Sequence, residues 1–473
     1  MMGVTGIGTS ALPEGWIRTP LNLLLAHNSG NSKLIKGKQS PVRQVGLFPG
    51  FSASGQDVWC QSYAHEGRAI IISAVGARCG KCFRAEGKWS AIANTHIIWP
   101  DEGIIDRDFL WYKVNDENFW IRGGSAQPFV KVKDTFKKKF SLPPLNEQQR
   151  IAEKIETLFA ELDAGEASLQ KVQTLLTQYR QSILKAAVTG KLTADWRTKN
   201  KNKLESGHDL LKRILKARRQ NWTGRGKYKE PAPPDTSNLP KLPKSWIWAS
   251  VGQICQVITG TTPSKQNNNQ YYGGTIPFLK PTDLNQGANI SEAREFLTDL
   301  GAQHARVVPR GTVLVTGIGA TTGKTGISQF SNAAFNQQIH AIPPEPNIVL
   351  SHFLYLAIIE TGFQNQIWEN ASATTLPIIN KSNFEKLLLP IPSFFEQQVI
   401  SSEVESALSA LSYYEKLCQH TLTRSTALRQ SILKEAFAGR LVAQDPNDEP
   451  ASELLERIRA ESGQKSKKKK GAK

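Results

Sequence analysis

One segment of this 473-residue chain occurs twice without an insertion or a deletion. The first copy runs from Glu-Gln-Gln at 147–149 to Gly-x-Leu at 190–192, and the second runs from Glu-Gln-Gln at 396–398 to Gly-x-Leu at 439–441. Both copies also contain Gln-Ser-Ile-Leu-Lys, at 181–185 and 430–434. The offset is 249 residues at every one of these motifs. A repeat with a constant offset indicates one rigid structural element that is present twice.

Each copy carries an apolar stripe whose members recur at alternating steps of four and three residues, the spacing that keeps one helix face against a partner helix. The first stripe contains Ile151, Ile155, Leu158, Leu162, Leu169, Val172, Leu176 and Ile183. The second stripe contains Ile400, Val404, Leu411, Leu428 and Ile432. Its middle is less apolar, because it includes Cys418, Thr421 and Ser425. A helix over 147–188 would be about 63 Å long, whereas helices of globular proteins average about 11 to 12 residues. The pattern therefore predicts two long helices that form a coiled coil rather than two ordinary core helices.

The duplication extends beyond the helices. Leu-Pro-x-x-Trp-Ile occurs at 12–17 and 242–247, and Gly-Ala-x-x-Gly-Lys occurs at 76–81 and 319–324. These offsets are 230 and 243 residues, so the second half has extra residues ahead of its Gly-Lys segment. The chain is thus predicted to consist of two related halves, each a globular domain followed by a long helix.

The globular parts show patterns of both strand and helix. Short apolar runs at 69–73 and 311–315 predict buried strands that end at the glycine-rich segments, and an apolar run at 353–359 predicts a helix. Prolines precede each long helix, and Gly190 and Gly439 follow them as expected C-caps. We expect a mixed α/β (α+β) protein.

The chain is strongly basic, with a net charge of +18. Basic chains commonly bind the phosphate backbone of nucleic acids and release its counterions. Residues 191–245 hold 15 Lys or Arg against 5 Asp or Glu, a net of +10, and a lysine-rich run follows at 465–470. We interpret the first as a basic linker and the better candidate for a nucleic-acid contact, and the second as part of a disordered, solvated tail.

Neither a membrane span nor a secretory segment is expected. The longest purely apolar runs are only a few residues, and the sequence before Trp16 lacks the basic and apolar stretches of a signal peptide. The five cysteines are scattered and odd in number, which favours reduced thiols. These features predict a cytoplasmic protein.

Motifs for catalysis and cofactor binding do not match. The second glycine-rich segment is similar to a phosphate-binding loop, but Ile318 stands where that loop requires glycine. Cys79 and Cys82 have the spacing of zinc ligands, yet Thr322 and Thr325 replace them in the repeat, so the segment can fold without metal. No amino-methyltransferase motif, metal-dependent nuclease motif or dinucleotide fingerprint is present. We expect a chain with no catalytic residue, no metal site and no cofactor of its own.

Three motifs together resemble those of the specificity subunit of type I restriction-modification systems. They are Pro-x-x-x-Glu-Gln-Gln before each long helix, Gln-Ser-Ile-Leu-Lys-x-Ala-x-x-Gly-x-Leu at its end, and Ile-Pro-Phe-Leu-Lys-x-x-Asp at 276–283. The resemblance covers nearly the whole chain, and its specificity comes from the two copies in the same order.

The resemblance implies two target-recognition domains that alternate with two conserved helices, paired antiparallel about a pseudo-twofold axis. The first domain would span 1–141, and the central helical region with the basic linker would span 142–240. The second domain would span 241–389, the C-terminal helical region 390–463 and the tail 464–473. The implied partners are double-stranded DNA, two methyltransferase subunits and restriction subunits that act as motor-nucleases. S-adenosylmethionine, ATP and Mg²⁺ are expected in those partner subunits.

A specificity subunit of this kind would recognise DNA without catalysing a reaction. Two domains that differ in sequence and are held apart by the helices imply an asymmetric site whose half-sites are separated by an unread gap. The candidate DNA contacts, chosen because Arg, Lys or Thr near a loop can contact base edges or phosphate, are Arg78, Lys81, Arg84, Lys280, Thr322 and Lys324. Two alternatives stay open: a standalone DNA methyltransferase with an unrecognised cofactor site, and a DNA-binding regulator that acts alone.

Overall fold

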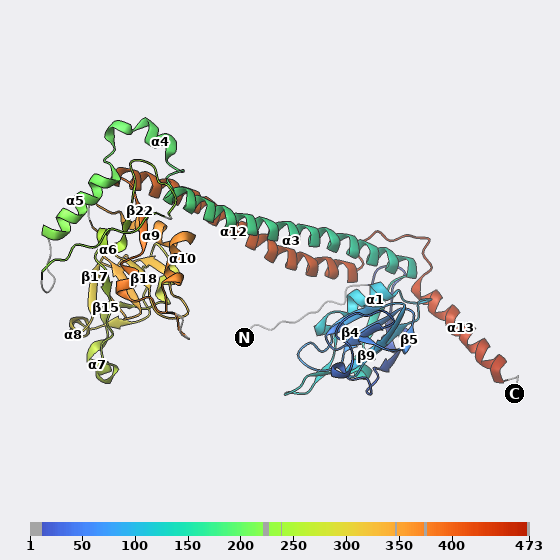
Figure 1. Cartoon of the computed structure of the whole chain (residues 1–473). Coiled ribbons are helices and arrows are strands. Elements are labelled where there is room, and N and C mark those ends of the chain that lie inside the picture. Colours follow the sequence, from blue (N-terminus) through green and yellow to red (C-terminus); the bar gives the residue numbers. More distant parts are fainter. Residues whose placement is uncertain (1–11, 221–226, 238, 346–347, 373–375, 471–473) are drawn as a thin grey trace, which may run out of the picture. The chain divides into compact units, whose positions relative to one another are not determined.

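The computed structural model describes residues 12–220, 227–237, 239–345, 348–372 and 376–470 (Figure 1). The chain divides into two compact units. Unit 1 consists of Met1–Leu169 and Gln419–Lys473, and unit 2 consists of Gln170–Cys418. Each unit thus contains one globular domain and a part of both long helices.

The domain in unit 1 is built on two four-stranded sheets. One has the order β2-β9-β6-β7, formed by Leu25–Ser29, Thr95–Pro100, Ala69–Ser73 and Cys82–Ala85. The other has the order β4-β3-β8-β5, formed by Gly55–Cys60, Phe48–Ser52, Lys88–Ala91 and His65–Glu66. Within these sheets β3 and β8 run parallel, and the other neighbours are antiparallel. The apolar run at 69–73 forms the fully buried β6, as predicted.

The domain in unit 2 repeats this plan. Its first sheet has the order β14-β21-β18-β19, formed by Ile258–Thr259, Ile339–Ile342, Val313–Thr316 and Thr325–Ile327. Its second has the order β16-β15-β20-β17, formed by Phe296–Leu297, Tyr272–Leu279, Asn332–Phe335 and Arg306–Pro309, with β15 and β20 parallel. The strand predicted from 311 begins at Val313, because Gly311 has a φ of 82° and lies in the turn before it. The predicted pair of related α+β domains is confirmed.

One helix covers a sheet in each domain. In unit 1, α1 (Arg107–Val114) packs against β6 and β7. In unit 2, α9 (Ser351–Ile359) packs against β18 and β19, and it contains the apolar run predicted as a helix at 353–359. The same layer order in both units follows from the duplicated sequence.

A short strand pair leads into each long helix. In unit 1, β1 (Ile17–Pro20) pairs antiparallel with β12 (Lys139–Leu142). In unit 2, β13 (Ile247–Ser250) pairs in the same way with β22 (Leu388–Ile391). The strand that precedes each helix is therefore fixed to the first strand of its own domain, which sets the direction in which the helix leaves.

The two long helices are continuous over their whole length (Figure 1). They are α3 (Leu145–Val188) and α12 (Phe394–Phe437), with 44 residues each. Just beyond them Gly190 has a φ of 73° and Gly439 a φ of 70°, the left-handed conformation expected of a C-cap glycine. No described helix, these two included, is apolar enough over a sufficient length to cross a membrane.

The long helices pair antiparallel. Within unit 1, Nη2 of Arg429 lies 2.6 Å from Oδ1 of Asp163. Four residues earlier on α12, Ser425 Oγ donates to Oε1 of Glu166 at 2.5 Å. The partner's number rises on α3 as it falls on α12, so the expected antiparallel pairing is confirmed.

The predicted apolar stripe is buried at some positions and open at others. Its buried members are Ile151, Ile155, Ile183, Ile400, Val404, Leu411 and Ile432. Its half-buried members are Leu158, Leu162, Leu169 and Leu176. Val172 and Leu428 were also predicted to lie in the seam between the helices, but they are 40% and 47% exposed. A stripe with a 3.5-residue period drifts by about 20° per heptad around a helix of 3.6 residues per turn, which turns some of its members toward solvent.

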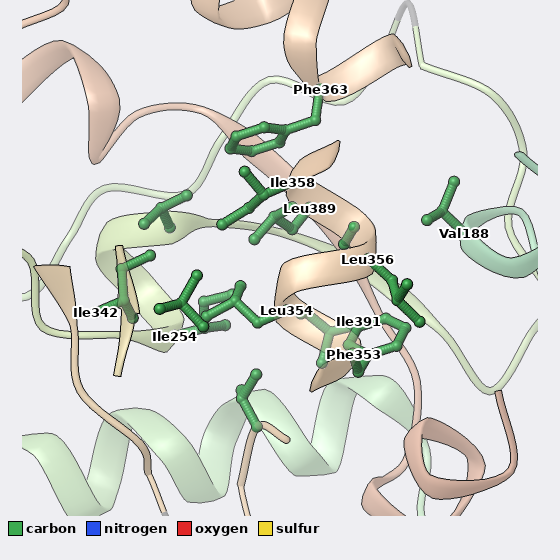
Figure 2. Packing of buried hydrophobic residues seen from close by; sticks show 14 of the residues in the cluster. Val188, Ile254, Ile342, Phe353, Leu354, Leu356, Ile358, Phe363, Leu389 and Ile391 are labelled. Carbon is green, nitrogen blue, oxygen red and sulfur yellow. The ribbon is translucent and has the colours of Figure 1, made fainter. Parts of the chain in front are cut away.

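The buried ends of the helices belong to the domain cores. In unit 2, Ile183 and Val188 of α3 join a cluster that also contains Phe353 of α9. Figure 2 shows part of this cluster, in which Ile391 of β22 lies beside the side chains of α9. Burial of such a side chain stabilises the fold by about 1.5 to 3 kcal/mol. Helix and domain therefore share one core within the unit.

The end of the chain completes the first domain. Beyond α12, the amide of Ala451 at the start of α13 (Ala451–Lys470) donates to the carbonyl of Gly15 at 3.0 Å. Asp448 accepts from Arg150, near the start of α3, at 2.6 Å. Unit 1 is thus assembled from both ends of the sequence.

Helix α13 extends past the point at which the sequence suggested a disordered tail. The tail was expected from 464, whereas α13 continues through Lys470, and residues 471–473 lie outside the described part of the chain. The segment is rich in Ala, Glu, Arg and Lys, which favour helix, so a run of charge there is compatible with helical structure.

Candidate nucleic-acid interface

The two glycine-rich segments form equivalent turns. Residues 76–81 connect β6 to β7, and residues 319–324 connect β18 to β19. Both glycines of each turn have positive φ, at 93° and 95° in the first and 108° and 89° in the second. This conformation is readily available only to glycine, so the motif is required by the backbone.

Matching hydrogen bonds fix both turns. Gly80 N donates to Ser73 O at 2.9 Å, and Gly323 N donates to Thr316 O at 2.8 Å. Outside the hairpins, Gly76 N donates to Pro128 O at 2.8 Å and Gly319 N donates to Pro377 O at 3.0 Å. The turns therefore have one geometry in both domains, that of a β-hairpin connection.

The second glycine of each turn lies close to its own domain. A Cβ at Gly80 would lie 2.8 Å from Trp120 Cδ1, and a Cβ at Gly323 would lie 2.3 Å from Gln364 Oε1. Glycine at this position therefore lets the backbone lie close to a side chain of the same unit.

The tip of the turn is where the two domains differ. Arg78 is exposed at the first tip, and Thr321, which occupies the same place 243 residues later, is exposed at the second. Lys81 is exposed with its ammonium 6.0 Å above the ring of Phe83, and Lys324 Nζ donates to Asn285 Oδ1 at 2.6 Å. Three predicted candidates, Arg78, Lys81 and Lys324, therefore place cations at or beside equivalent turns.

Thr322 is not available at the surface. Its side chain is 4% exposed, and its hydroxyl donates to Gly319 O at 2.8 Å and Pro377 O at 3.2 Å. The exposed neighbour Thr321 was missed by the sequence analysis, although an alignment of the two turns places it opposite Arg78.

Arg84 has an intramolecular role. Its guanidinium lies 4.2 Å from the ring centre of Trp111, with Nε 3.0 Å from Asp108 Oδ1 and Nη1 3.4 Å from Glu156 Oε1. These contacts connect β7 to α1 and α3 and leave the cation engaged within unit 1. Because its guanidinium is engaged within unit 1, Arg84 is set apart from the other candidate DNA contacts. The sequence shows only that Arg84 lies near the turn and does not reveal these contacts.

Lys280 follows the end of β15 in the Ile-Pro-Phe-Leu-Lys-x-x-Asp motif. Its ammonium pairs with Glu295 and lies 5.7 Å from the ring centre of Phe278. Its amide donates to Asp283 Oδ2 at 2.7 Å, so the final Asp of the motif caps the turn. The ion pair is partly exposed, and Lys280 remains a partly neutralised cation at the domain surface.

A buried Glu–Trp contact fastens each domain to its helix. Trp16 Nε1 donates to Glu147 Oε2 at 3.0 Å in unit 1, and Trp246 Nε1 donates to Glu396 Oε2 at 2.9 Å in unit 2. Glu396 also accepts from Arg197 Nε at 2.9 Å. Burial raises the pKa of Glu147, an effect that the bond from Trp16 partly offsets. The first residue of Glu-Gln-Gln is thus an acceptor for the Trp of Leu-Pro-x-x-Trp.

The second residue of the motif bridges helix and domain. Gln148 Nε2 donates to Pro143 O at 2.9 Å, and its Oε1 accepts from Asp106 N at 2.8 Å. Gln397 makes the same pair of bonds, donating to the carbonyl of Pro392 at 3.1 Å and accepting from the amide of Leu350 at 2.8 Å. The rigid repeat in the sequence therefore encodes a rigid joint between each domain and its helix.

Part of the basic linker is a packed helix. Helix α5 (Gly207–Gln220) buries Leu210 and Ile214 in the core of unit 2. Its opposite side carries the exposed cations Lys212, Lys216 and Arg219, the last paired with Glu230. The linker residues 221–226 lie outside the described part of the chain. A basic face next to the second domain is consistent with a phosphate contact.

The paired cysteines are buried. Cys82 Sγ lies 3.5 Å from Gly80 O and 3.4 Å from Val114 O, and burial raises the pKa of its thiol. Over the described ranges no three His, Cys, Asp or Glu side chains gather as metal ligands. The Cys79 and Cys82 side chains are core residues of unit 1.

Comparison with known proteins supports a single family. Residues 39–174 and 243–413 match the family model of the type I restriction modification DNA specificity domain. The chain is 26% identical to the Type I restriction enzyme EcoDI specificity subunit of Escherichia coli over 95% of this chain and 96% of that protein. It is 28% identical to the EcoBI specificity subunit of Escherichia coli over 68% of this chain and 64% of that protein.

Two solved structures have a similar fold. One chain, from "Structural basis underlying complex assembly and conformational transition of the type I R-M system", has a TM-score of 0.60 at 18% identity, covering 91% of this chain and 100% of that one. The HsdS subunit from Thermoanaerobacter tengcongensis has a TM-score of 0.53 at 19% identity, covering 92% and 99%. These likenesses concern the fold.

Proposed function

The chain belongs to the type I restriction-modification DNA specificity family, and we propose that it selects an asymmetric, bipartite DNA sequence for the methyltransferase and restriction subunits of its complex. Each globular domain contacts one half-site, and the base pairs between the half-sites are not read. The chain itself is not catalytic. S-adenosylmethionine, ATP and Mg²⁺ act in the partner subunits, and the complex works in the cytoplasm.

One observation carries this proposal: two domains of one topology present the same glycine turn with different side chains. The backbone of the turn is held by matching hydrogen bonds at Gly80 and Gly323, whereas the tip carries Arg78 in one domain and Thr321 in the other. Arg is suited to a bidentate contact with guanine, and Thr can contact several bases. A constant frame with a variable tip is what two different half-sites require.

Charge supports DNA as the partner. The net charge is +18, and Lys81 and Lys324 occupy equivalent places beside the two tips. Phosphate contacts by such lysines contribute affinity without sequence information, and they weaken as salt rises. The turns thus combine a phosphate contact with a residue that differs between half-sites.

Mapping methylated adenines across the host genome, with and without this chain, tests the proposal. We expect one bipartite, asymmetric motif to lose methylation when the chain is removed. An unchanged methylation pattern, or loss of a continuous palindromic motif, would contradict it. Tight binding of S-adenosylmethionine by the isolated chain would favour a standalone methyltransferase instead.

A further inference from the structure

Helices α5 and α13 are a second duplicated element of the chain. Leu-Leu-x-Arg-Ile occurs at 210–214 in α5 and at 454–458 in α13, an offset of 244 residues. The first leucine of each motif is buried, since Leu210 is 0% and Leu454 3% exposed. The two helices therefore bury the same face, α5 in unit 2 and α13 in unit 1.

Polar contacts of the two helices are repeated as well. Arg213 Nη2 lies 3.0 Å from Glu205 Oε2, and Arg457 Nη2 lies 2.9 Å from Glu449 Oε2, again 244 residues later. Each helix also donates its first amide to the carbonyl that precedes the Trp of Leu-Pro-x-x-Trp in its own unit, from Gly207 to Ser245 and from Ala451 to Gly15. The fold thus uses equivalent positions of α5 and α13 in the same way.

The charges of the two helices differ. Residues 205–220 hold five Lys or Arg against two Asp or Glu, a net charge of +3. The equivalent residues 449–464 hold two Lys or Arg against four Asp or Glu, a net charge of −2. The positions that pack are therefore constant between the copies, whereas the charge that surrounds them has changed sign.

Lys212 and Lys216 account for part of this difference. Both are exposed, and their equivalents in α13 are Glu456 and Ala460. Residues four apart share one face of a helix, where like charges repel each other. Among the described residues neither ammonium makes a hydrogen bond or an ion pair. These two lysines do not stabilise the packing of α5 and are available to an anionic partner.

Two further lysines border a hollow of about 400 Å³ at the start of α5. They are Lys201 and Lys244, which are exposed and make no hydrogen bond or ion pair within the described part of the chain. None of the described residues that line the hollow is an Asp or a Glu. The equivalent of Lys244 in unit 1 is Glu14, two residues before the Trp of Leu-Pro-x-x-Trp. The excess of cations in unit 2 thus continues beyond the helix itself.

The composition of this surface favours nucleic acid over protein. Protein interfaces are enriched in aromatic residues and depleted of lysine. Among the described residues of 191–245 no large apolar side chain is exposed, and the segment has a net charge of +10. Lysines without an apolar centre are suited to the phosphates of DNA. A partner present in two equivalent copies would need the same surface in both units, and α13 does not repeat it.

We propose that Lys201, Lys212, Lys216 and Lys244 bind the phosphate backbone of duplex DNA that flanks the half-site contacted by the domain of unit 2. Such a contact adds affinity without sequence information. It makes the complex grip the DNA further out on one side of the bipartite sequence than on the other. The inference rests on the proposed function and adds to it a one-sided contact outside the sequence that is read.

Trimming of the DNA tests the proposal on the assembled complex of this chain with its methyltransferase subunits. Affinity is measured for a duplex that carries the target and two long flanks, and for duplexes that lack one flank or the other. We expect the wild-type complex to lose more affinity when one particular flank is removed. This difference between the flanks should shrink in the variant with Lys212→Gln and Lys216→Gln, and it should vanish when Lys201→Gln and Lys244→Gln are added.

Salt dependence gives a second readout. Each phosphate contact contributes about 0.9 to the slope of the logarithm of the association constant against the logarithm of salt concentration. The slope should therefore fall by about 2 in the variant with Lys212→Gln and Lys216→Gln, equally on target and on unrelated DNA. The reciprocal variant, with Glu456→Lys and Ala460→Lys on α13, should make the other flank matter as well.

The matched control combines Lys171→Gln and Lys416→Gln, which remove two exposed lysines of α3 and α12 from the same unit. It should keep the difference between the flanks and the salt slope, and every variant should unfold at the wild-type temperature. An equal effect of the two flanks on the wild type would overturn the inference and leave the proposed function standing. Loss of a protein subunit from the variant complex, with the salt slope unchanged, would assign the surface to a protein and also overturn it. A wild-type complex that does not distinguish target from unrelated DNA would overturn both.

Discussion

The indole nitrogen of Trp16 donates to the carboxylate of Glu147 at 3.0 Å, across 131 residues of sequence, and both side chains are buried. Trp246 and Glu396 repeat this contact in unit 2 at 2.9 Å. Two motifs that are far apart in the sequence, Leu-Pro-x-x-Trp and Glu-Gln-Gln, are thus the two sides of one joint.

Removal of the donor from this joint should destabilise unit 1. Trp16→Phe keeps an aromatic side chain but removes the indole N–H together with part of the ring system. It leaves a buried carboxylate oxygen without its donor, which costs about 1 to 3 kcal/mol. Urea unfolding of the full chain measures the loss. Trp248→Phe is the matched control, because that indole donates to Pro240 O at 3.0 Å in an exposed position, and its removal should cost about 0.5 kcal/mol. Equal losses in the two variants would contradict a special role for the joint.

The two glutamates should respond differently to neutralisation. Glu396→Gln breaks a buried ion pair with Arg197 and should cost about 3 to 5 kcal/mol at pH 7. Among the described residues Glu147 forms no such ion pair, and burial raises its pKa above 4.5. Its contribution to stability is full below pH 4.5 and is lost as the pH rises through the folded-state pKa. Glu147→Gln should therefore be tolerated at pH 7.

Urea unfolding at pH 4 and pH 7 measures this contrast. The free energy of unfolding of Glu147→Gln, compared with that of the wild type, should be higher at pH 7 than at pH 4. The reason is that only the wild-type carboxyl has to ionise in a buried position as the pH rises. A Glu147→Gln variant that is as unstable at pH 7 as Glu396→Gln would disprove the difference between the joints.

Glycine at the second position of the first turn should be indispensable. Gly80→Ala adds a Cβ at a φ of 95° and places it 2.8 Å from the buried Trp120, so it combines backbone strain with a clash. Gly67→Ala has a similar φ of 104° but no atom within 4 Å of the added Cβ. We expect Gly67→Ala to lower the free energy of unfolding by about 1 to 2 kcal/mol through backbone strain alone. Gly80→Ala should lower it by more. Thermal unfolding of the two variants measures which of them is less stable. A lower stability of Gly67→Ala than of Gly80→Ala would contradict the prediction.

Arg78 and Arg84 should separate recognition from stability. Arg78→Ala removes an exposed cation from the first tip and should weaken methylation of the target roughly 10- to 100-fold, equivalent to about 1 to 3 kcal/mol for a base contact, with assembly unchanged. Arg84→Ala removes a cation that contacts Asp108 and Glu156 and should lower the unfolding temperature of unit 1. Methylation kinetics of the assembled complex, read beside the melting curves, compare the two. Equal methylation of target DNA by the Arg78→Ala and wild-type complexes would refute the recognition role.

The architecture could be predicted from the sequence, because the long helices have a regular apolar period and the whole plan is repeated. The steps of four and three residues and the constant offset of 249 identify the long helices directly, and the strand at 69–73 is apolar throughout. The exposure of Val172 and Leu428 was not accessible, since a stripe in sequence does not specify how far each position rotates from its partner.

The candidate site was accessible only in part. The turns and the tip residue Arg78 follow from the repeat, and alignment of the two turns could have identified Thr321. The ion-pair network of Arg84 and the burial of Thr322 depend on residues distant in sequence, namely Glu156 and Pro377. Such contacts leave no local pattern.

The closure of unit 1 by the end of the chain has a consequence for biosynthesis. Unit 2 is the single stretch Gln170–Cys418, whereas unit 1 also needs Gln419–Lys473, including Asp448 for Arg150 and Ala451 for Gly15. A ribosome therefore releases all of unit 2 before the residues that finish unit 1 have emerged. The domain that is made first is the last to be completed, and a chain terminated early is left with an unfinished N-terminal half.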